Sequence, residues 1–134
     1  MSGEGMTARR EAWLRQARSD FEVAELTEQR GFHSQACYHY GQAAEKALKG
    51  LLIALGTLPP YSHSLDRLLD ALSEQGIDTE RLQGLHLKAL TRMNSETRYP
   101  RDDEAPVDRF DGRDTSMARD ASQQVLLFVD QALT

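Results

Sequence analysis

The stretch that decides the fold runs from Phe32 to Gly56 and reads FHSQACYHYGQAAEKALKGLLIALG. Its apolar residues recur every three or four positions in two adjoining rows, which predicts a helix from about His33 to Leu55 with neighbours on two sides. The rows are Ala36-Tyr40-Ala43-Ala47-Leu51-Ala54 and Cys37-Gly41-Ala44-Leu48-Leu52-Leu55. Small residues such as Gly41 would let another helix approach closely, so we expect this to be the central helix.

The segments on either side carry the same helical repeat and no alternation of period two, so we expect an all-α protein. One domain of residues 1–134, folded as an up-and-down bundle of four or five helices, accounts for these segments. Residues 1–6 are expected to be disordered, and residues 95–114, which are rich in charge and contain two prolines, to form a long loop or an ordered connection over the surface. The other predicted helices run from about Thr7 to Gln29, from a cap at Ser64 to just before Gly76, from a cap at Asp78 or Thr79 to about Asn94, and from a cap at Asp114 or Thr115 to the end.

The composition excludes several classes of protein. Sixteen basic and twenty-one acidic residues give a net charge of -5, which argues against binding to DNA or to an anionic membrane by bulk charge. No apolar run approaches the roughly 20 residues of a membrane span, and the first residues lack the apolar stretch of a secretory signal, so we expect a cytoplasmic protein. The lone Cys37 is interpreted as a buried structural thiol, and the four histidines lack ligand spacing, so neither a metal nor a cofactor is expected.

One polar row interrupts the apolar surface of the predicted central helix. His39, Gln42, Lys46 and Lys49 follow one another at spacings of three, four and three, and therefore share a face. Two ammonium groups with an imidazole and an amide could hold a phosphate. The alternative is an ordinary solvated face on which Glu45 pairs with Lys49 one turn further on.

Two further candidates lie outside this helix. His63 precedes a helix N-terminus, where free backbone N–H groups favour an anion, although its ring could equally bond a loop carbonyl. Arg98 and Tyr99 offer a guanidinium for phosphate and a ring for stacking on a base, and Pro100 restricts Tyr99 to an extended conformation. The alternative for Arg98 is a bond to a nearby carboxylate such as Asp102.

Four fragments together resemble the HEPN domain family, and they cover most of the chain, from about Ala12 to Leu133. The resemblance implies an antiparallel helical bundle that usually dimerises and is often encoded beside a minimal nucleotidyltransferase in a toxin–antitoxin arrangement. The fragments are residues 32–37 leading into 42–52, His63-Ser64-Leu65, Thr97-Arg98-Tyr99-Pro100 and Leu127-Phe128-Val129.

Many HEPN proteins are ribonucleases with an arginine followed within a few residues by a histidine. The chain departs from this pattern after Arg98, because none of the residues at the corresponding positions can act as a base of near-neutral pKa. Arg81 and His86 have the required spacing, but we interpret the match as coincidence, since both would lie within one helix and point to different sides. The residues that follow Arg98 at the histidine positions are Asp103, Glu104 and Ala105.

Three hypotheses remain, and the missing histidine favours the first. The chain is a non-catalytic module that binds a nucleotide or RNA, forms a homodimer and partners a minimal nucleotidyltransferase, for which Tyr99 is by analogy the nearest tyrosine to modify. The second is a ribonuclease toxin that uses Arg98, or Arg81 and His86, so whether the chain is an enzyme stays open. The third is a bundle that serves only oligomerisation.

Overall fold

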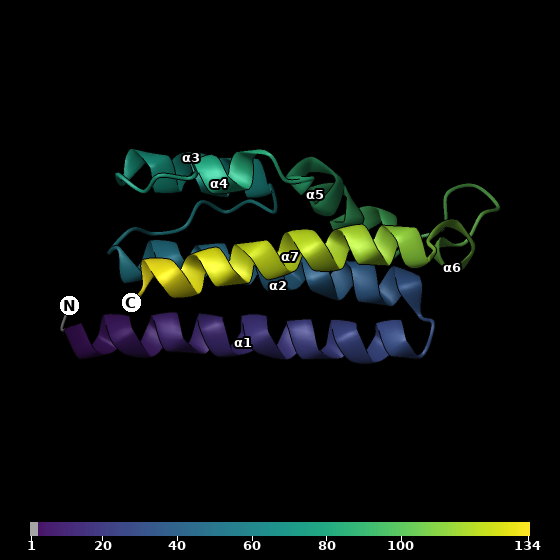
Figure 1. The fold of residues 1–134 in the computed structure, drawn as a ribbon, viewed down its shortest axis with the longest axis horizontal. Helices are drawn as coiled ribbons and strands as arrows, with labels where there is room; N and C mark the ends of the chain where they lie inside the picture. The colour runs from purple at the N-terminus through teal and green to yellow at the C-terminus, as the bar shows by residue number, and fades with distance from the viewer. Residues whose placement is uncertain (1–2) are drawn as a thin grey trace.

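The computed structural model describes residues 3–134, which form an all-α bundle (Figure 1). Within these residues there is no strand, only an isolated bridge between Arg101 and Glu104. The predicted fold class is therefore confirmed. The helices are α1 (Gly3–Gln29), α2 (His33–Ala54), α3 (Leu65–Glu74), α4 (Glu80–Gln83), α5 (Leu87–Glu96), α6 (Pro106–Arg109) and α7 (Gly112–Ala132).

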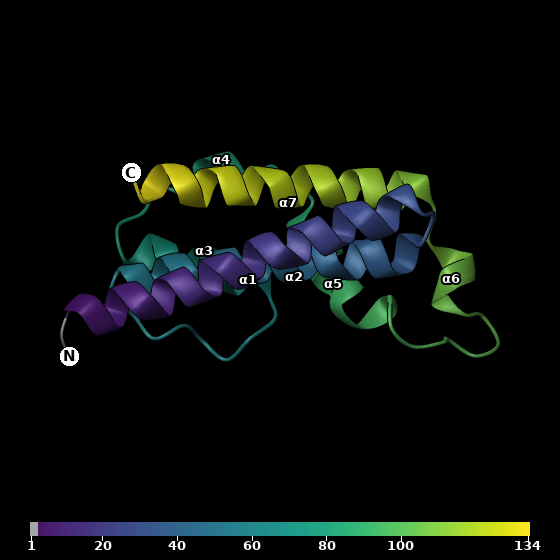
Figure 2. The same ribbon diagram turned by 90° about the horizontal axis from the view of Figure 1, so that it is seen from below.

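The long helices α1 and α2 form an antiparallel hairpin, and Gly31 makes the turn between them with a φ of 82°. Figure 1 shows α1 on one side of α2 and the short helices α3, α4 and α5 on the other, while α7 runs along α2. Figure 2 shows from below that the first and last helices bring both ends of the described chain to the same end of the bundle. None of the helices is long and apolar enough to cross a bilayer, as far as residues 3–134 are concerned.

The centre of the bundle is α2, as its sequence predicts. Tyr40, Leu48 and Leu52 have no exposed surface, and each buried leucine contributes about 1.5–3 kcal/mol to folding. The two glycines of α2 mark close helix contacts. A Cβ atom on Gly41 would lie 3.3 Å from the carbonyl oxygen of Leu90 in α5, and one on Gly50 would lie 3.0 Å from a methyl carbon of Leu14 in α1.

The predicted role of Cys37 as a buried thiol is also confirmed. Its side chain has no exposed surface, and its Sγ lies 3.8 Å from the hydroxyl of Thr115 in α7. Burial raises the pKa of the thiol to about 12, with the Thr115 contact acting in the opposite direction. The thiolate is therefore disfavoured, and Cys37 acts as a small core residue.

The third predicted helix begins at its expected cap. The Ser64 hydroxyl accepts a hydrogen bond from the backbone N–H of Arg67 at 3.3 Å, and Gly76 follows the helix with a φ of 86°. The buried face of α3 consists of Leu65, Leu68, Leu69 and Leu72.

The prediction of one helix from Asp78 or Thr79 to about Asn94 is wrong, because the structure has two helices there. The chain forms the one-turn helix α4, leaves the helix at Gly84, and begins α5 only at Leu87. Asp78 accepts a hydrogen bond from the N–H of Glu80, whereas the Thr79 side chain does not cap α4. Gly84 and the backbone bond from Leu85 back to Leu82 turn the chain there, so the apolar repeat continues across two helices instead of one.

The predicted connection over residues 95–114 is shorter than expected and contains a short helix. Its first two residues complete α5, Pro106 begins α6, and α7 starts at Gly112. The cap of α7 is Asp111, not Asp114 or Thr115. The Asp111 carboxylate accepts from the N–H groups of Arg113 and Asp114, while the Asp114 carboxylate accepts from the N–H of Asp111.

The N-terminal expectation also needs correction. We expected residues 1–6 to be disordered, but α1 begins at Gly3, so residues 3–6 are helical. Extending a helix that is already formed requires no new nucleation, and a glycine in the helix is only about 1 kcal/mol less favourable than an alanine. Residues 1 and 2 lie outside the described part of the chain.

Candidate functional site

The polar side chains of α2 lie where α1, α5 and the segment before α3 meet the central helix. We call the set His39, Gln42, Glu45, Lys46 and Lys49 the α2 polar face. Together with Tyr38 it extends over about 16 Å, from the helical rise of 1.5 Å per residue. Each of the three neighbouring segments contacts a different part of this face.

Lys46 joins the α2 polar face to α1. Its Nζ lies 2.6 Å from an oxygen of Asp20, which is only 7% exposed, and the Gln16 amide donates to the other Asp20 oxygen at 3.2 Å. The charge of Lys46 is thus balanced by a carboxylate whose two oxygens both accept hydrogen bonds. A carboxylate held in this way leaves Lys46 with little free charge for a phosphate.

Glu45 organises the end of the face nearest to α3. Glu45 is only 5% exposed, and its carboxylate accepts from Lys49 Nζ at 3.0 Å and lies 3.0 Å from Nδ1 of His63. The Lys49 ammonium also lies 5.9 Å from the ring centre of Trp13. The ion pair that we gave as the alternative for Lys49 is therefore present, and His63 bonds this carboxylate instead of a loop carbonyl. With Nδ1 held by Glu45, the largely exposed imidazole presents Nε2 to solvent.

His39 supplies no positive charge to the face. It is half-buried, and its Nδ1 is buried without a hydrogen-bond partner among the described residues. Burial lowers the pKa of His39 below its ordinary 6.5, Asp20 acts in the opposite direction, and Lys46 lowers it further. The ring contacts that of Tyr38 edge to face, with centres 5.2 Å apart. Neutral imidazole is the favoured form at physiological pH.

Arg98 differs from the lysines because no carboxylate neutralises it. Its Nε donates to the backbone oxygen of Asn94 at 2.7 Å, and its Cζ lies 5.2 Å from the ring centre of Tyr38 and 5.3 Å from that of Tyr99. The terminal guanidinium nitrogens have no partner among residues 3–134. The bond to Asp102 that we gave as the alternative is absent from the described contacts.

The structure brings the α2 polar face and Arg98 together, although they are far apart in the sequence. The Gln42 amide donates to Asn94 at 2.7 Å, and Tyr38 lies one turn before Gln42 on the same side of α2. Tyr38 and Asn94 were missed by the sequence analysis. The i to i+4 spacing of Tyr38 and Gln42 is a signal that could have found the first, whereas only the tertiary contact identifies the second.

Arg81 and His86 do not form a joint site. Arg81 donates to Gln131 of α7 at 2.5 Å and its Cζ lies 6.0 Å from the ring centre of Phe128, whereas His86 is exposed beyond the end of α4. We had assumed that both residues lie in one helix, and this is wrong, because Arg81 is in α4 and His86 precedes α5. The expectation that they point to different places nevertheless holds. Among residues 3–134 there is also no cluster of three acidic, histidine or cysteine side chains that could hold a metal ion.

The fold and the site define a small all-α bundle whose central helix carries a polar face beside an arginine and two tyrosines. The family model described as HEPN domain matches residues 10–132, so the chain belongs to the HEPN domain family.

Two solved structures are similar to this one. The structure of TT1696 from Thermus thermophilus has a TM-score of 0.81 at 35% identity, over 92% of this chain and 97% of that one. The structure of ST0689, an archaeal HEPN homologue, has a TM-score of 0.70 at 24% identity, over 93% of this chain and 98% of that one, and supports the fold alone. Among the curated proteins searched, none matches.

Proposed function

We propose that this HEPN chain is a nucleotide- or RNA-binding module, that it acts as a homodimer, and that it partners a minimal nucleotidyltransferase in a toxin–antitoxin type of system. The observation that carries the binding proposal is the Arg98 guanidinium, which lies beside two tyrosine rings and has no carboxylate partner among the described residues.

The chemistry of Arg98 and Tyr99 suits a nucleotide. The bond from Arg98 Nε to Asn94 orients the guanidinium and leaves its terminal nitrogens for a phosphate, a contact that contributes about 1.5–3 kcal/mol. Tyr99 is 62% exposed and can stack on a base, which is worth about 1–3 kcal/mol. Recognition of this kind is tolerant of sequence, so single-stranded RNA fits as well as a mononucleotide.

The other predicted site residues have a secondary part in this proposal. Gln42 and Arg98 both donate a hydrogen bond to Asn94. From Gln42 the α2 polar face continues toward His63. Because Lys46 and Lys49 are paired with carboxylates, we assign the main phosphate contact to Arg98. We therefore place Arg98 and Tyr99 at the centre of the proposed site, and we assign no direct phosphate contact to His39, Lys46, Lys49 and His63 of the sequence-based prediction.

Binding measurements on short single-stranded RNA and on AMP test the binding proposal. By fluorescence anisotropy we expect Arg98→Ala to weaken RNA binding about tenfold, and Tyr99→Ala to do so by a similar factor. The control is Arg15→Ala, which removes an exposed arginine of α1 and should leave affinity unchanged. Equal affinities in all four proteins, with unchanged helicity, would show that Arg98 and Tyr99 are ordinary surface.

The proposal of a non-catalytic chain has its own test. Asp103, Glu104 and Ala105 take the place of the ribonuclease histidine, so we expect no cleavage of total RNA by the purified protein. Cleavage that disappears in the Arg98→Ala preparation would instead support the ribonuclease hypothesis.

The partner is tested by copurification from the native host followed by mass spectrometry. We expect a small nucleotidyltransferase to be recovered with the chain. Because Tyr99 is exposed, it is open to modification, and an added nucleotide there would be seen as a mass shift of the peptide that contains it. Recovery of the chain alone, with unmodified Tyr99, would contradict the partnership.

A further inference from the structure

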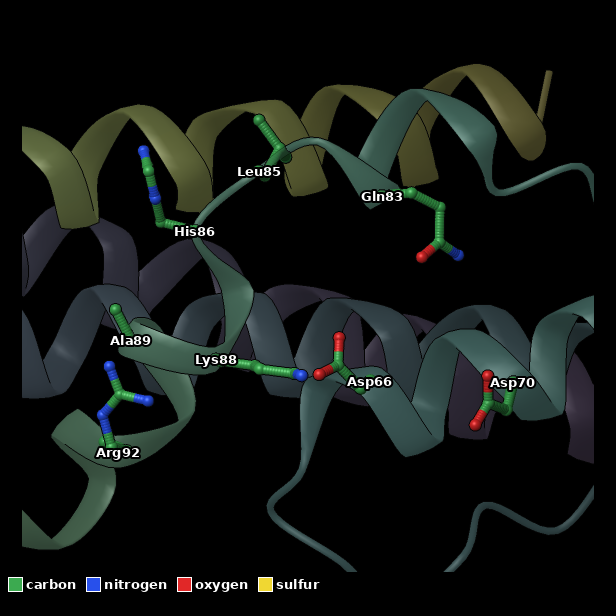
Figure 3. Close-up of a pocket in the computed structure, with 8 residues that line it drawn as sticks. All are labelled: Asp66, Asp70, Gln83, Leu85, His86, Lys88, Ala89 and Arg92. Carbon is green, nitrogen blue, oxygen red and sulfur yellow. The ribbon is translucent and has the colours of Figure 1, made fainter.

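A cleft of about 630 Å³ lies between α3 and α5, away from the site described above. Figure 3 shows Asp66 and Asp70 projecting from α3, Lys88 and Arg92 from α5, and Gln83 from α4. A volume of this size is within the usual range for small-molecule sites, which is about 300–1,000 Å³.

The two walls of the cleft carry opposite charge. Asp66 and Asp70 are one turn apart on α3, and Lys88 and Arg92 are one turn apart on α5, so each pair shares a face. Lys88 points toward Asp66 (Figure 3), yet no ion pair joins the two walls anywhere in the described chain. Because the opposite charges of the two walls do not form ion pairs with each other, a molecule can lie between them.

The hydrogen-bonding capacity of the walls narrows the chemistry of that molecule. On the α5 wall, Lys88 and Arg92 offer only donors, and the fork of Arg92 with the ammonium of Lys88 suits a phosphate. The imidazole of His86, just before α5, also lines the cleft and can donate or accept. The opposite wall offers acceptors. The Asp66 and Asp70 carboxylates accept only, and the Gln83 amide nitrogen already donates to Thr79 at 3.0 Å, which leaves its oxygen free to accept. A ligand that fits both walls has a phosphate at one end and several hydroxyl groups at the other.

We propose that this cleft binds a phosphorylated ribose, with the phosphate on Lys88 and Arg92 and the ribose hydroxyls on Asp66, Asp70 and Gln83. Carboxylates commonly accept hydrogen bonds from ribose hydroxyls in nucleotide sites. The moiety occurs both in a free sugar phosphate and in a ribonucleotide. The site is separate from the one at Arg98, because neither Arg98 nor its neighbours Tyr38 and Asn94 line the cleft.

Calorimetry with ribose 5-phosphate tests the proposal. We expect the wild type to bind it at least about tenfold more tightly than inorganic phosphate, because the hydroxyls add contacts on the acceptor wall. Arg92→Ala should weaken ribose 5-phosphate binding about tenfold, and Asp70→Ala, which removes an acceptor for the ribose hydroxyls, should bring the affinity for ribose 5-phosphate toward that for inorganic phosphate. Arg15→Ala is the matched control and should bind as the wild type does.

The same experiment separates the possible ligands and the two sites. Tighter binding of AMP than of ribose 5-phosphate identifies a ribonucleotide as the source, and the reverse order identifies a free sugar phosphate; both agree with the proposal if binding depends on Arg92. Equal affinity for ribose 5-phosphate and inorganic phosphate, or tighter binding of phosphoethanolamine, would overturn the ribose assignment. Binding that is lost in Arg98→Ala but not in Arg92→Ala would overturn the cleft and leave the proposed function standing.

Discussion

At the scale of single residues, the most constrained side chain of the α2 polar face is Glu45. Its carboxylate holds Lys49 on the same helix and His63 in the segment between α2 and α3, so one buried group fixes the connection to the central helix. A buried charge is destabilising unless it is paired, and here Lys49 and His63 both pair with the carboxylate.

Substitution of Glu45 by alanine should therefore destabilise the protein strongly. The change leaves the Lys49 ammonium, whose side chain is only 12% exposed, without its partner, and removing one member of a buried pair costs about 3–5 kcal/mol. Urea denaturation should show a decrease in the free energy of unfolding near the lower value. The control Glu22→Ala, at an exposed position of α1, should change it by about 0.5 kcal/mol or less. Equal effects of the two substitutions would mean that Glu45 makes no net contribution.

His39 should make stability depend on pH. Burial lowers the pKa of His39 in the folded protein below 6.5, its ordinary value, so the unfolded chain takes up the proton at a higher pH than the folded one. Between these two pKa values the unfolded state holds more protons, and stability must fall as the pH drops below about 6.5. We expect the loss of stability between about pH 7.5 and pH 5.5 to be smaller in His39→Gln than in the wild type.

The control for His39 is the same substitution at His86, which is exposed and should leave the pH dependence as it is in the wild type. Urea midpoints at the two pH values give the comparison. A His39→Gln protein that loses as much stability as the wild type would show that other groups set the acid sensitivity.

At the scale of elements, the sequence predicts well where a helix has a continuous apolar repeat and a clear stop. The α2 pattern and the Ser64 cap of α3 are examples, since both depend on neighbouring residues alone. The break at Gly84 was missed because Leu82, Leu85 and Ala89 keep the helical spacing across it. The cap of α7 was missed because Asp111 and Asp114 both fit the position, and only their reciprocal hydrogen bonds decide between them.

The contact of α2 with α5 should be sensitive to any side chain at Gly41. Its Cβ position is 3.3 Å from a backbone oxygen of α5, and a backbone cannot move aside as the end of a flexible side chain does. We expect Gly41→Val to lower the free energy of unfolding by about 1–3 kcal/mol. Gly84→Val is the matched control, because a Cβ there meets nothing within 4 Å. Equal unfolding energies for the two variants would show that α5 adjusts freely.

A shift of α5 would also affect the proposed site, because Asn94 and Arg98 are placed by that helix. The Gly41→Val variant should therefore bind single-stranded RNA more weakly than Gly84→Val even where both are folded. This effect distinguishes the position of α5 from global stability, since binding is measured on folded protein.

At the scale of the whole molecule, the site depends on contacts that local sequence patterns do not contain. The pairing of Lys49 with Glu45 follows from the helical spacing and was given as an alternative. By contrast, the sequence shows the residue type at Lys46 but not its pairing, because that depends on Asp20 from α1. The same holds for the cleft between α3 and α5, whose walls come from segments with no shared motif. Tertiary packing decides which of several similar charged residues remain available to a ligand.

The oligomeric state is the last property of the whole molecule that we predict. The wide apolar surface of α2 does not by itself indicate a dimer, because α1, α7, α3 and α5 of the same chain cover that helix. The expectation of a dimer rests on the HEPN resemblance and on large apolar side chains that remain exposed. Leu58 and Tyr61 before α3 and Leu26 of α1 are each more than half exposed, which is common at protein interfaces. Sedimentation at micromolar concentration should give a species of twice the chain mass of 15.1 kDa. If one of these surfaces forms the dimer interface, serine substitutions there should shift the sedimenting species toward one chain mass; Leu58→Ser with Tyr61→Ser tests one surface and Leu26→Ser the other. A species of one chain mass at every concentration of the wild type would contradict the dimer.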